Sequence, residues 1–352
     1  MEFLVTRPRH TVEMAPGRRL LGLSLGERAR RMLRSAGLTE TCRLQGPDPL
    51  LLYPGEMVGP ASLGRELAEI EPGPDEVIEA QAGEQERPVV ILGEDARQRL
   101  LAGVDTIEGA CNACRSAKTR QVNLTVPTVA VISYKTERQA TRMLLSSLQK
   151  PFDGVVSRTI NRPVSLLLSS FFVNTSLTPN MLSILTFLIA LGAVALVVNS
   201  HYVWGTLVMQ FASILGGCDS EVARLKYQTT KLGGWLNTIF INVSNMLFVL
   251  GMGVGLSLDS ETSAPWNAVW LGAGVVSFFA ILFANCCAKR AQTEEATPFR
   301  RFLGRYLDPL VKRDFYFFFL ILALLGIPWA IMVLSFVGAV MPAFAICNKK
   351  KA

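Results

Sequence analysis

Residues Gly216 to Asn245 read GGCDSEVARLKYQTTKLGGWLNTIFINVSN, and this stretch separates two long hydrophobic segments of the chain. The segment before it, Pro163 to Cys218, contains no Asp, Glu, Lys or Arg, and neither does Leu232 to Leu258 after it. Segments of this length and composition are typical of membrane-spanning helices, which need about 20 apolar residues each. The charged residues that follow Cys218 are therefore expected at the end of one span and just before the next.

The spacing inside this stretch predicts two helix faces that meet. Asp219 and Ala223 lie one turn apart if the stretch is helical, and Gly233, Asn237 and Ile241 are spaced by four. Small residues let two helices approach closely, and polar groups at the edge of a membrane are usually paired or functional. We therefore expect these side chains to surround one cavity at the membrane boundary.

Hydropathy predicts six spans in the second half of the chain. The two longest charge-free segments are each divided by a break, at Asn199–His201 and at Gly326–Pro328. The predicted spans are 178–198, 202–217, 232–258, 262–288 and two shorter helices within 315–348.

Charge is sorted across these spans. Every Lys and Arg beyond residue 150 falls in the segments on one side, within 218–231, 289–314 and 349–352 or before the first span, while the other side holds only His201, Asp259 and Glu261. The positive-inside rule then places the N-terminal part and the C-terminus in the cytoplasm. The sequence predicts an integral protein of the inner or cytoplasmic membrane.

The central stretch resembles the signature of the membrane CDP-alcohol phosphotransferase family, D-x-x-D-G-x-x-A-R, eight residues, G-x-x-x-D-x-x-x-D. Four residues of this chain match the frame, Asp219, Ala223, Arg224 and Gly233, and the other four places hold Gly216, Ser220, Asn237 and Ile241. The resemblance implies a six-helix, all-α transmembrane domain over residues 151–352. It also implies that Gly216, Asp219, Ala223, Arg224 and Gly233 lie where the family binds a CDP-alcohol.

The resemblance assigns a role to each aspartate position of the signature. In the family, the first three aspartates bind Mg²⁺ or Mn²⁺ and the fourth is the proposed base for the acceptor hydroxyl. Here these places hold Gly216, Asp219, Asn237 and, as the base, Ile241. Asp219 and, weakly, Asn237 are the candidate metal ligands, and an isoleucine cannot accept a proton.

Two segments before the signature extend the resemblance. NTSLTPNMLSILTF, residues 174–187, is similar to the family's entry into the first span, and SRTINRPVS, residues 157–165, is similar to the basic segment that precedes it. Arg158 and Arg162, one helical turn apart, are candidates to hold an acceptor phosphate. Anchoring at the membrane surface is the alternative for both arginines.

The first half, residues 1–150, has a nearly neutral charge balance, with 20 Lys and Arg against 19 Asp and Glu. Its pattern predicts a cytoplasmic α/β domain. The predicted strands are 2–6, 50–53, 88–92 and 128–134; the predicted helices are 25–36, 60–70, 94–102 and 136–148. Residues 76–88 and 110–121 are expected to be loops.

An α/β domain ahead of six spans resembles the bifunctional inositol-phosphate cytidylyltransferase/CDP-inositol phosphotransferase group. In that group the first domain makes the CDP-alcohol, which requires a dense glycine-rich loop after the first strand. Gly17, Gly22 and Gly26 are too dispersed to form such a loop. A degenerate nucleotidyltransferase-like domain is expected, with a regulatory or docking role.

Three functions remain open on the sequence alone. The first is transfer of a phosphoalcohol from a CDP donor to an alcohol, in phospholipid or inositol-phosphate synthesis. The second is a pseudoenzyme that binds nucleotide, lipid or an active homologue, and the third is a membrane tether for the first domain. The expected partners are the lipid bilayer, CDP or a CDP-alcohol, and a second copy of the chain; nucleic acid is not expected.

Overall fold

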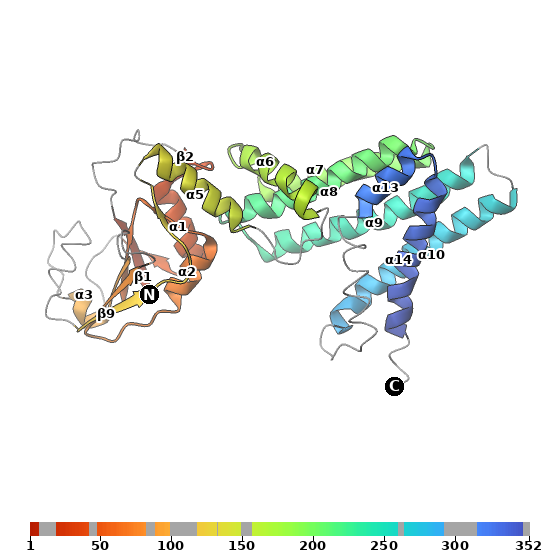
Figure 1. Cartoon of the computed structure of the whole chain (residues 1–352). Coiled ribbons are helices and arrows are strands. Elements are labelled where there is room, and N and C mark those ends of the chain that lie inside the picture. Colours follow the sequence, from red (N-terminus) through yellow and green to blue (C-terminus); the bar gives the residue numbers. More distant parts are fainter. Residues whose placement is uncertain are drawn as a thin grey trace. The chain divides into compact units, whose positions relative to one another are not determined.

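The computed structural model describes residues 1–6, 19–41, 48–81, 89–98, 118–131, 133–148, 157–259, 264–291 and 315–347. The chain forms two compact units (Figure 1). The α/β unit comprises Met1–Gln149 together with two short segments, Val173–Ser176 and Ala223–Gln228. The helical unit comprises the rest of the chain.

The α/β unit is built on a six-stranded mixed sheet with the strand order β4-β1-β5-β8-β7-β9. Strands β1 and β5 are parallel, β8 is antiparallel to both of its neighbours, and β7 and β9 are parallel. The strands are β1 (Glu2–Thr6), β4 (Thr39–Glu40), β5 (Leu50–Pro54), β7 (Glu76–Gln81), β8 (Val89–Leu92) and β9 (Lys118–Asn123).

The burial of each strand follows from its sequence. Strands β5 (LLLYP) and β8 (VVIL) are buried along their whole length, as expected for central strands covered on both faces. Strand β9 (KTRQVN) is mostly exposed and carries the charged side chains that protect a sheet edge from pairing with another chain. This arrangement places the core of the unit around β5 and β8.

The other elements of the unit are short. Helices α1 (Leu25–Ser35) and α2 (Ala61–Ala68) contribute Met32, Leu33, Leu63 and Leu67 to the same core as the sheet. Further elements are α3 (Glu94–Gln98), α5 (Tyr134–Ser146) and two small two-stranded sheets, β2 (Arg19–Leu20) with β3 (Leu23–Ser24), and β6 (Met57–Val58) with β10 (Val129–Ala130).

The predicted strands and helices of this half are confirmed in most places and wrong in three. Residues 76–81 and 118–121 were predicted as loops because they are polar, but they form β7 and most of β9; Val77, Ile78 and Ala80 of β7 are buried. The predicted strand at 128–134 is reduced to two residues. A capping box between Ser133 and Thr136 starts α5 at Tyr134 instead.

The helical unit contains a π-helical turn and seven helices among its described residues. They are η1 (Ser157–Asn161), α6 (Arg162–Phe172), α7 (Pro179–Val198), α8 (Tyr202–Leu225), α9 (Lys231–Leu258), α10 (Ala264–Ala291), α13 (Phe315–Leu324) and α14 (Pro328–Cys347). The last three residues of α8 belong to the α/β unit.

Local sequence signals set the helix ends. Thr178 caps α7 by accepting a hydrogen bond from the backbone N–H of Met181, and Pro179 occupies the first turn, where no backbone donor is needed. Thr230 caps α9 in the same way through the N–H of Gly233. Gly326, with φ of +73°, and Pro328 separate α13 from α14, as predicted.

Three described helices are long and apolar enough to cross a membrane: Pro179–Val198, Lys231–Leu258 and Pro265–Phe283. Phe315–Leu324 and Pro328–Val340 are apolar but shorter, and α8 carries Asp219, Glu221 and Arg224 in its second half. Many large apolar side chains of the unit are exposed, such as Leu188 on α7 and Phe279 on α10. This composition is compatible with a membrane protein.

Candidate functional site

Asp219 lies near the end of α8 and joins three helices of the helical unit. Its side chain is 3% exposed. One carboxylate oxygen accepts a hydrogen bond from the Ser183 hydroxyl of α7 at 2.5 Å, and the other accepts from the Asn237 amide of α9 at 3.2 Å and from the backbone N–H of Ser220. Three neutral donors therefore contact the one aspartate that the signature retains.

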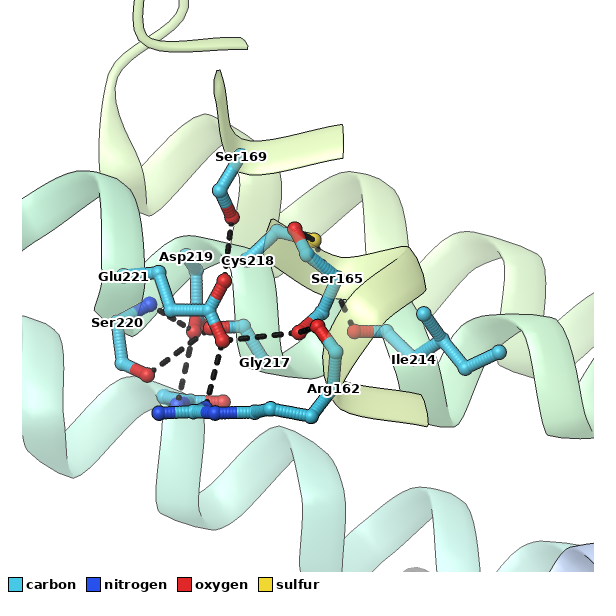
Figure 2. Close-up of polar contacts among 10 residues, drawn as sticks. Arg162, Ser165, Ser169, Ile214, Gly217, Cys218, Asp219, Ser220 and Glu221 are labelled. Carbon is cyan, nitrogen blue, oxygen red and sulfur yellow. Dashed lines mark hydrogen bonds and ion pairs between the residues drawn. The ribbon is translucent and has the colours of Figure 1, made fainter. Parts of the chain in front are cut away.

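Glu221, two residues further along α8, is the centre of a second buried cluster. The Arg162 guanidinium lies 2.7 Å from its Oε1, and the hydroxyls of Ser165 and Ser169 donate to the carboxylate at 3.0 and 2.7 Å (Figure 2). Because Glu221 is only 2% exposed, this ion pair is almost fully removed from water. Breaking one side of such a pair costs about 3–5 kcal/mol, so the cluster holds α6 against α8.

Sequence reasoning missed Glu221 because its position on α8 turns it away from Asp219. Glu221 does point away from Asp219, but its side chain binds Arg162 and two serines of α6 instead. A signal was available: Arg162, Ser165 and Ser169 are spaced i, i+3 and i+7 on α6, so they form a polar stripe on an otherwise apolar helix. A second polar pair lies in the same region, since the Gln210 side-chain amide donates to the Asn161 side-chain oxygen Oδ1 at 2.7 Å.

Gly216, Asn237 and Ile241 line one cavity. The spacing predicts this for Asn237 and Ile241, but Asp219, Ala223 and Gly233, which were expected around the same cavity, are not among its lining residues. The cavity has a volume of about 390 Å³ and is bounded by α7, α8, α9, α10, α13 and α14. Ser183 lines it too, and both Ser183 and Asn237 are hydrogen-bonded to Asp219. Three of the four aspartate positions of the signature therefore line this cavity, and the fourth, Asp219, is hydrogen-bonded to two of its lining residues.

The remaining candidate residues lie elsewhere. Gly233 stands in the first turn of α9, where a Cβ would come within 2.9 Å of the Asn180 side-chain oxygen. Ala223 is half-buried and Arg224 is exposed, and both belong to the α/β unit. Arg158 is exposed whereas Arg162 is buried against Glu221. Binding of an acceptor phosphate by these two arginines therefore stays a prediction. The two side chains lie in different environments, one exposed and one buried.

The end of α8 is fixed inside the α/β unit. The buried Arg28 guanidinium donates to the Leu225 carbonyl at 3.0 Å and lies over the Tyr227 ring, whose hydroxyl donates to the Gly59 carbonyl at 2.8 Å. Burial raises the pKa of Tyr227. Burial, together with the nearby Arg31, lowers the pKa of Lys226. The residues that follow the signature aspartate thus form part of the folded α/β unit.

The residues around Asp219 do not fit a pair of divalent cations. Mg²⁺ and Mn²⁺ prefer several oxygen ligands that include carboxylates. Within the described parts of the chain no three His, Cys, Asp or Glu side chains come together, and Glu221 is engaged by Arg162 and two serines. The Asn237 amide presents its N–H₂ group, not its oxygen, to Asp219.

Curated relatives can now be set beside this geometry. A bifunctional IPC transferase and DIPP synthase from Aquifex aeolicus is 36% identical over 127 residues, which are 36% of this chain and 29% of the relative. Proteins of the same name from Archaeoglobus fulgidus and Rubrobacter xylanophilus are 36% identical over 114 residues and 32% identical over 142 residues.

The predicted resemblance is confirmed. The chain is similar in sequence to bifunctional IPC transferase and DIPP synthase proteins. The matched part spans 32% of this chain and 23% of the Archaeoglobus protein, and 40% of this chain and 32% of the Rubrobacter protein. The match therefore covers about a third or less of each relative's length. No family model matches the chain.

Proposed function

We propose that the helical unit is a membrane-embedded domain of the CDP-alcohol phosphotransferase type that no longer transfers a phosphoalcohol. The relatives support this type of function through their names, which describe transferases and synthases. Three helices long enough to span a bilayer and the one-sided distribution of Lys and Arg support the membrane setting. On this proposal the domain has six spans, with α8, α13 and α14 added to those three.

The main support for this proposal is the set of hydrogen bonds that Asp219 accepts. The two oxygens of Asp219 accept hydrogen bonds from Ser183, Asn237 and the Ser220 backbone, and these three donors are neutral. Hydrogen bonds to a charged group each contribute about 1.5–3 kcal/mol, so these three donors stabilise the negative charge of Asp219. Asn237 stands where the signature has a carboxylate, and its amide donates a hydrogen bond to Asp219.

The base position leads to the same proposal. Ile241 lines the cavity with an aliphatic side chain, and no side chain that can accept a proton replaces it among the described residues lining the cavity. Without a base, the acceptor hydroxyl would have to attack while protonated, and the positioned base typically contributes about 10²–10⁴-fold to the rate. We propose a pseudoenzyme that uses the fold for binding and carries the α/β unit as a docking or regulatory domain, with a second copy of the chain as an expected partner.

Release of CMP by the purified full-length protein in lipid nanodiscs tests this function. The substrates are CDP-inositol and CDP-diacylglycerol with an alcohol acceptor, with and without Mn²⁺, beside an active relative. We expect no CMP above background from the natural chain or from Asp219→Ala. Turnover that requires Mn²⁺ and disappears in Asp219→Ala would overturn the proposal in favour of residual transfer.

A restored variant gives the matched control. Gly216→Asp, Asn237→Asp and Ile241→Asp together rebuild the four aspartates of the signature. A Cβ at Gly216 meets only the Thr186 methyl group at 3.6 Å, an ordinary contact, so the first of these side chains has room. If the triple variant gains metal-dependent CMP release while the natural chain has none, the missing carboxylates account for the inactivity.

A further inference from the structure

Helix α5 of the α/β unit, labelled in Figure 1, has a basic face that the sites described above do not use. Lys135, Arg138 and Arg142 are exposed, and at 100° per residue they fall within an arc of about 60° around the helix. We call these three residues the basic face. Gln139 borders the arc and is exposed too, whereas Glu137, the acidic residue of α5, lies about 160° from Lys135. The exposed side of α5 is therefore purely cationic in its charge.

The packing of α5 holds the basic face outward. Ala140 and Leu144 are buried, and they lie about 140° and 180° from Lys135 on the helix. The helix contacts β10, and a capping box between Ser133 and Thr136 fixes the residue at which it begins. Because its apolar side is packed, the helix cannot rotate to bury the three cations.

The three cations of the basic face have no ion-pair or side-chain hydrogen-bond partner within the described parts of the chain. Helix α1 of the same unit is different, since Arg30 and Arg34 both pair with Glu40. Arg31 of α1 pairs with Glu27 at 2.7 Å. Residues 1–150 hold nearly equal numbers of basic and acidic residues, so a general excess of positive charge does not explain the unpaired face.

The connection to the helical unit keeps α5 close to lipid on the proposed membrane setting. Residues 147–156 join α5 to η1, and at about 3.5 Å per residue a chain of this length reaches no more than about 40 Å. Helix α6 follows η1 directly and exposes the apolar side chains of Leu167 and Phe171. Exposed apolar side chains on one side of a helix are typical of a helix at a bilayer surface.

The spacing of the cations favours a surface over a single small anion. At 1.5 Å per residue, Lys135 and Arg142 lie about 10 Å apart along the helix axis. The three cations therefore lie along a line and do not converge on one phosphate group, as a phosphate site requires. A plane of anionic headgroups can meet all three cations at once.

We propose that the basic face of α5 binds the anionic lipid headgroups of the bilayer that holds the helical unit. The inference rests on the proposed function only in taking that unit to be embedded in a membrane. Each Lys or Arg held near an anionic bilayer strengthens attachment about fivefold. The α/β unit then lies against the membrane when the lipid is anionic and is released when it is neutral, which gives its proposed regulatory role an input.

Acylation of lysine amines in the full-length chain, held in lipid nanodiscs and read by peptide mass spectrometry, tests the proposal. The discs contain phosphatidylcholine alone or with phosphatidylglycerol added. At low salt we expect Lys135 to be acylated at least about fivefold more slowly in the anionic discs, and high salt should remove the difference. Lys118, exposed on β9 of the same unit, is the internal reference and should change less than about twofold. Equal rates for Lys135 in the two discs, or equal slowing of both lysines, would overturn the proposal.

A pair of double variants isolates the basic face. Arg138→Gln with Arg142→Gln removes two of its cations and keeps Lys135 as the reporter, so the protection of Lys135 by anionic lipid should fall to about twofold or less. Arg30→Gln with Arg34→Gln removes two exposed arginines of α1 from the same unit and should leave that protection unchanged. Protection that survives the α5 variant, or that both variants abolish equally, would overturn the proposal.

Soluble anions distinguish the bilayer from other partners. Glycerol 3-phosphate or a single-stranded oligonucleotide, added to the neutral discs, should leave the acylation rate of Lys135 unchanged. If either one protects Lys135 more than phosphatidylglycerol does, the basic face binds a soluble phosphate or a nucleic acid and the proposal is overturned. CMP release in the separate assay would overturn the proposed function and leave this lipid contact standing.

Discussion

Replacing Glu221 with alanine removes the acceptor at the centre of the cluster on α6 and α8. The Arg162 guanidinium would remain 90% buried with its ion-pair partner gone, and the hydroxyls of Ser165 and Ser169 would lose the same carboxylate. Removing one partner of a buried ion pair costs about 3–5 kcal/mol, because the other charge stays buried. The unfolding equilibrium constant of the helical unit should therefore rise by about 100- to 5,000-fold.

The assay is equilibrium unfolding of the purified chain in mixed micelles, followed by the loss of helical circular dichroism. Arg158→Ala is the matched control, since this arginine is exposed four residues before Arg162, and it should change stability by less than about 0.5 kcal/mol.

A double variant separates charge from packing. Arg162→Met with Glu221→Leu leaves no lone charge, so it should cost clearly less than Glu221→Ala alone. A single variant that costs less than about 1 kcal/mol, or a double variant at least as unstable as the single one, would refute the reasoning that the buried charge pair holds the two helices together.

Two further predictions concern packing and pH. Gly255→Ala should destabilise the helical unit by about 1–3 kcal/mol, because a Cβ there would meet the Val197 carbonyl oxygen at 2.1 Å. Gly192→Ala is the control and should be neutral or stabilising, because a Cβ there meets nothing within 4 Å. Thermal unfolding of both variants checks this prediction, and equal effects would contradict it. Because burial raises the pKa of Tyr227, its stabilisation of the α/β unit is complete below the ordinary tyrosine pKa of about 10 and is lost as pH rises through the higher folded value. In Tyr227→Phe the free energy of unfolding should therefore fall less steeply above about pH 10. The variant should lose about 1 kcal/mol at neutral pH, because the hydrogen bond to Gly59 is removed. An unchanged dependence of the unfolding free energy on pH would count against this prediction.

Local signals made the helices of the second half predictable. Apolar segments, a Thr-Pro cap at residues 178–179 and a Gly-Ile-Pro break at 326–328 are all read from neighbouring residues, and each marks a helix end in the structure. The places of Asn237 and Ile241 in the cavity were predictable from a spacing of four, which fixes which side chains share a helix face, whereas Asp219, Ala223 and Gly233 were expected there and do not line it.

Pairings between distant segments were not predictable. Strand β7 contains Glu76 and Glu79, so its local pattern is weak, and it becomes a strand through pairing with β8 and β9. The partnership of Glu221 with Arg162 depends on α6 packing against α8 over 59 residues of sequence. The polar stripe on α6 indicates that a polar partner is needed but does not identify it. The hydrogen bond that the Asn237 amide donates to Asp219 also joins two segments that are distant in the sequence.

Titration of the full-length chain with Mn²⁺, followed by the loss of the electron paramagnetic resonance signal of free Mn²⁺, tests the account most directly. The central claim is that hydrogen bonds from Ser183, Asn237 and the Ser220 backbone replace a metal at Asp219. We expect no stoichiometric binding by the natural chain, and binding once Gly216, Asn237 and Ile241 are all changed to aspartate. Stoichiometric Mn²⁺ binding by the natural chain that disappears in Asp219→Ala would contradict it.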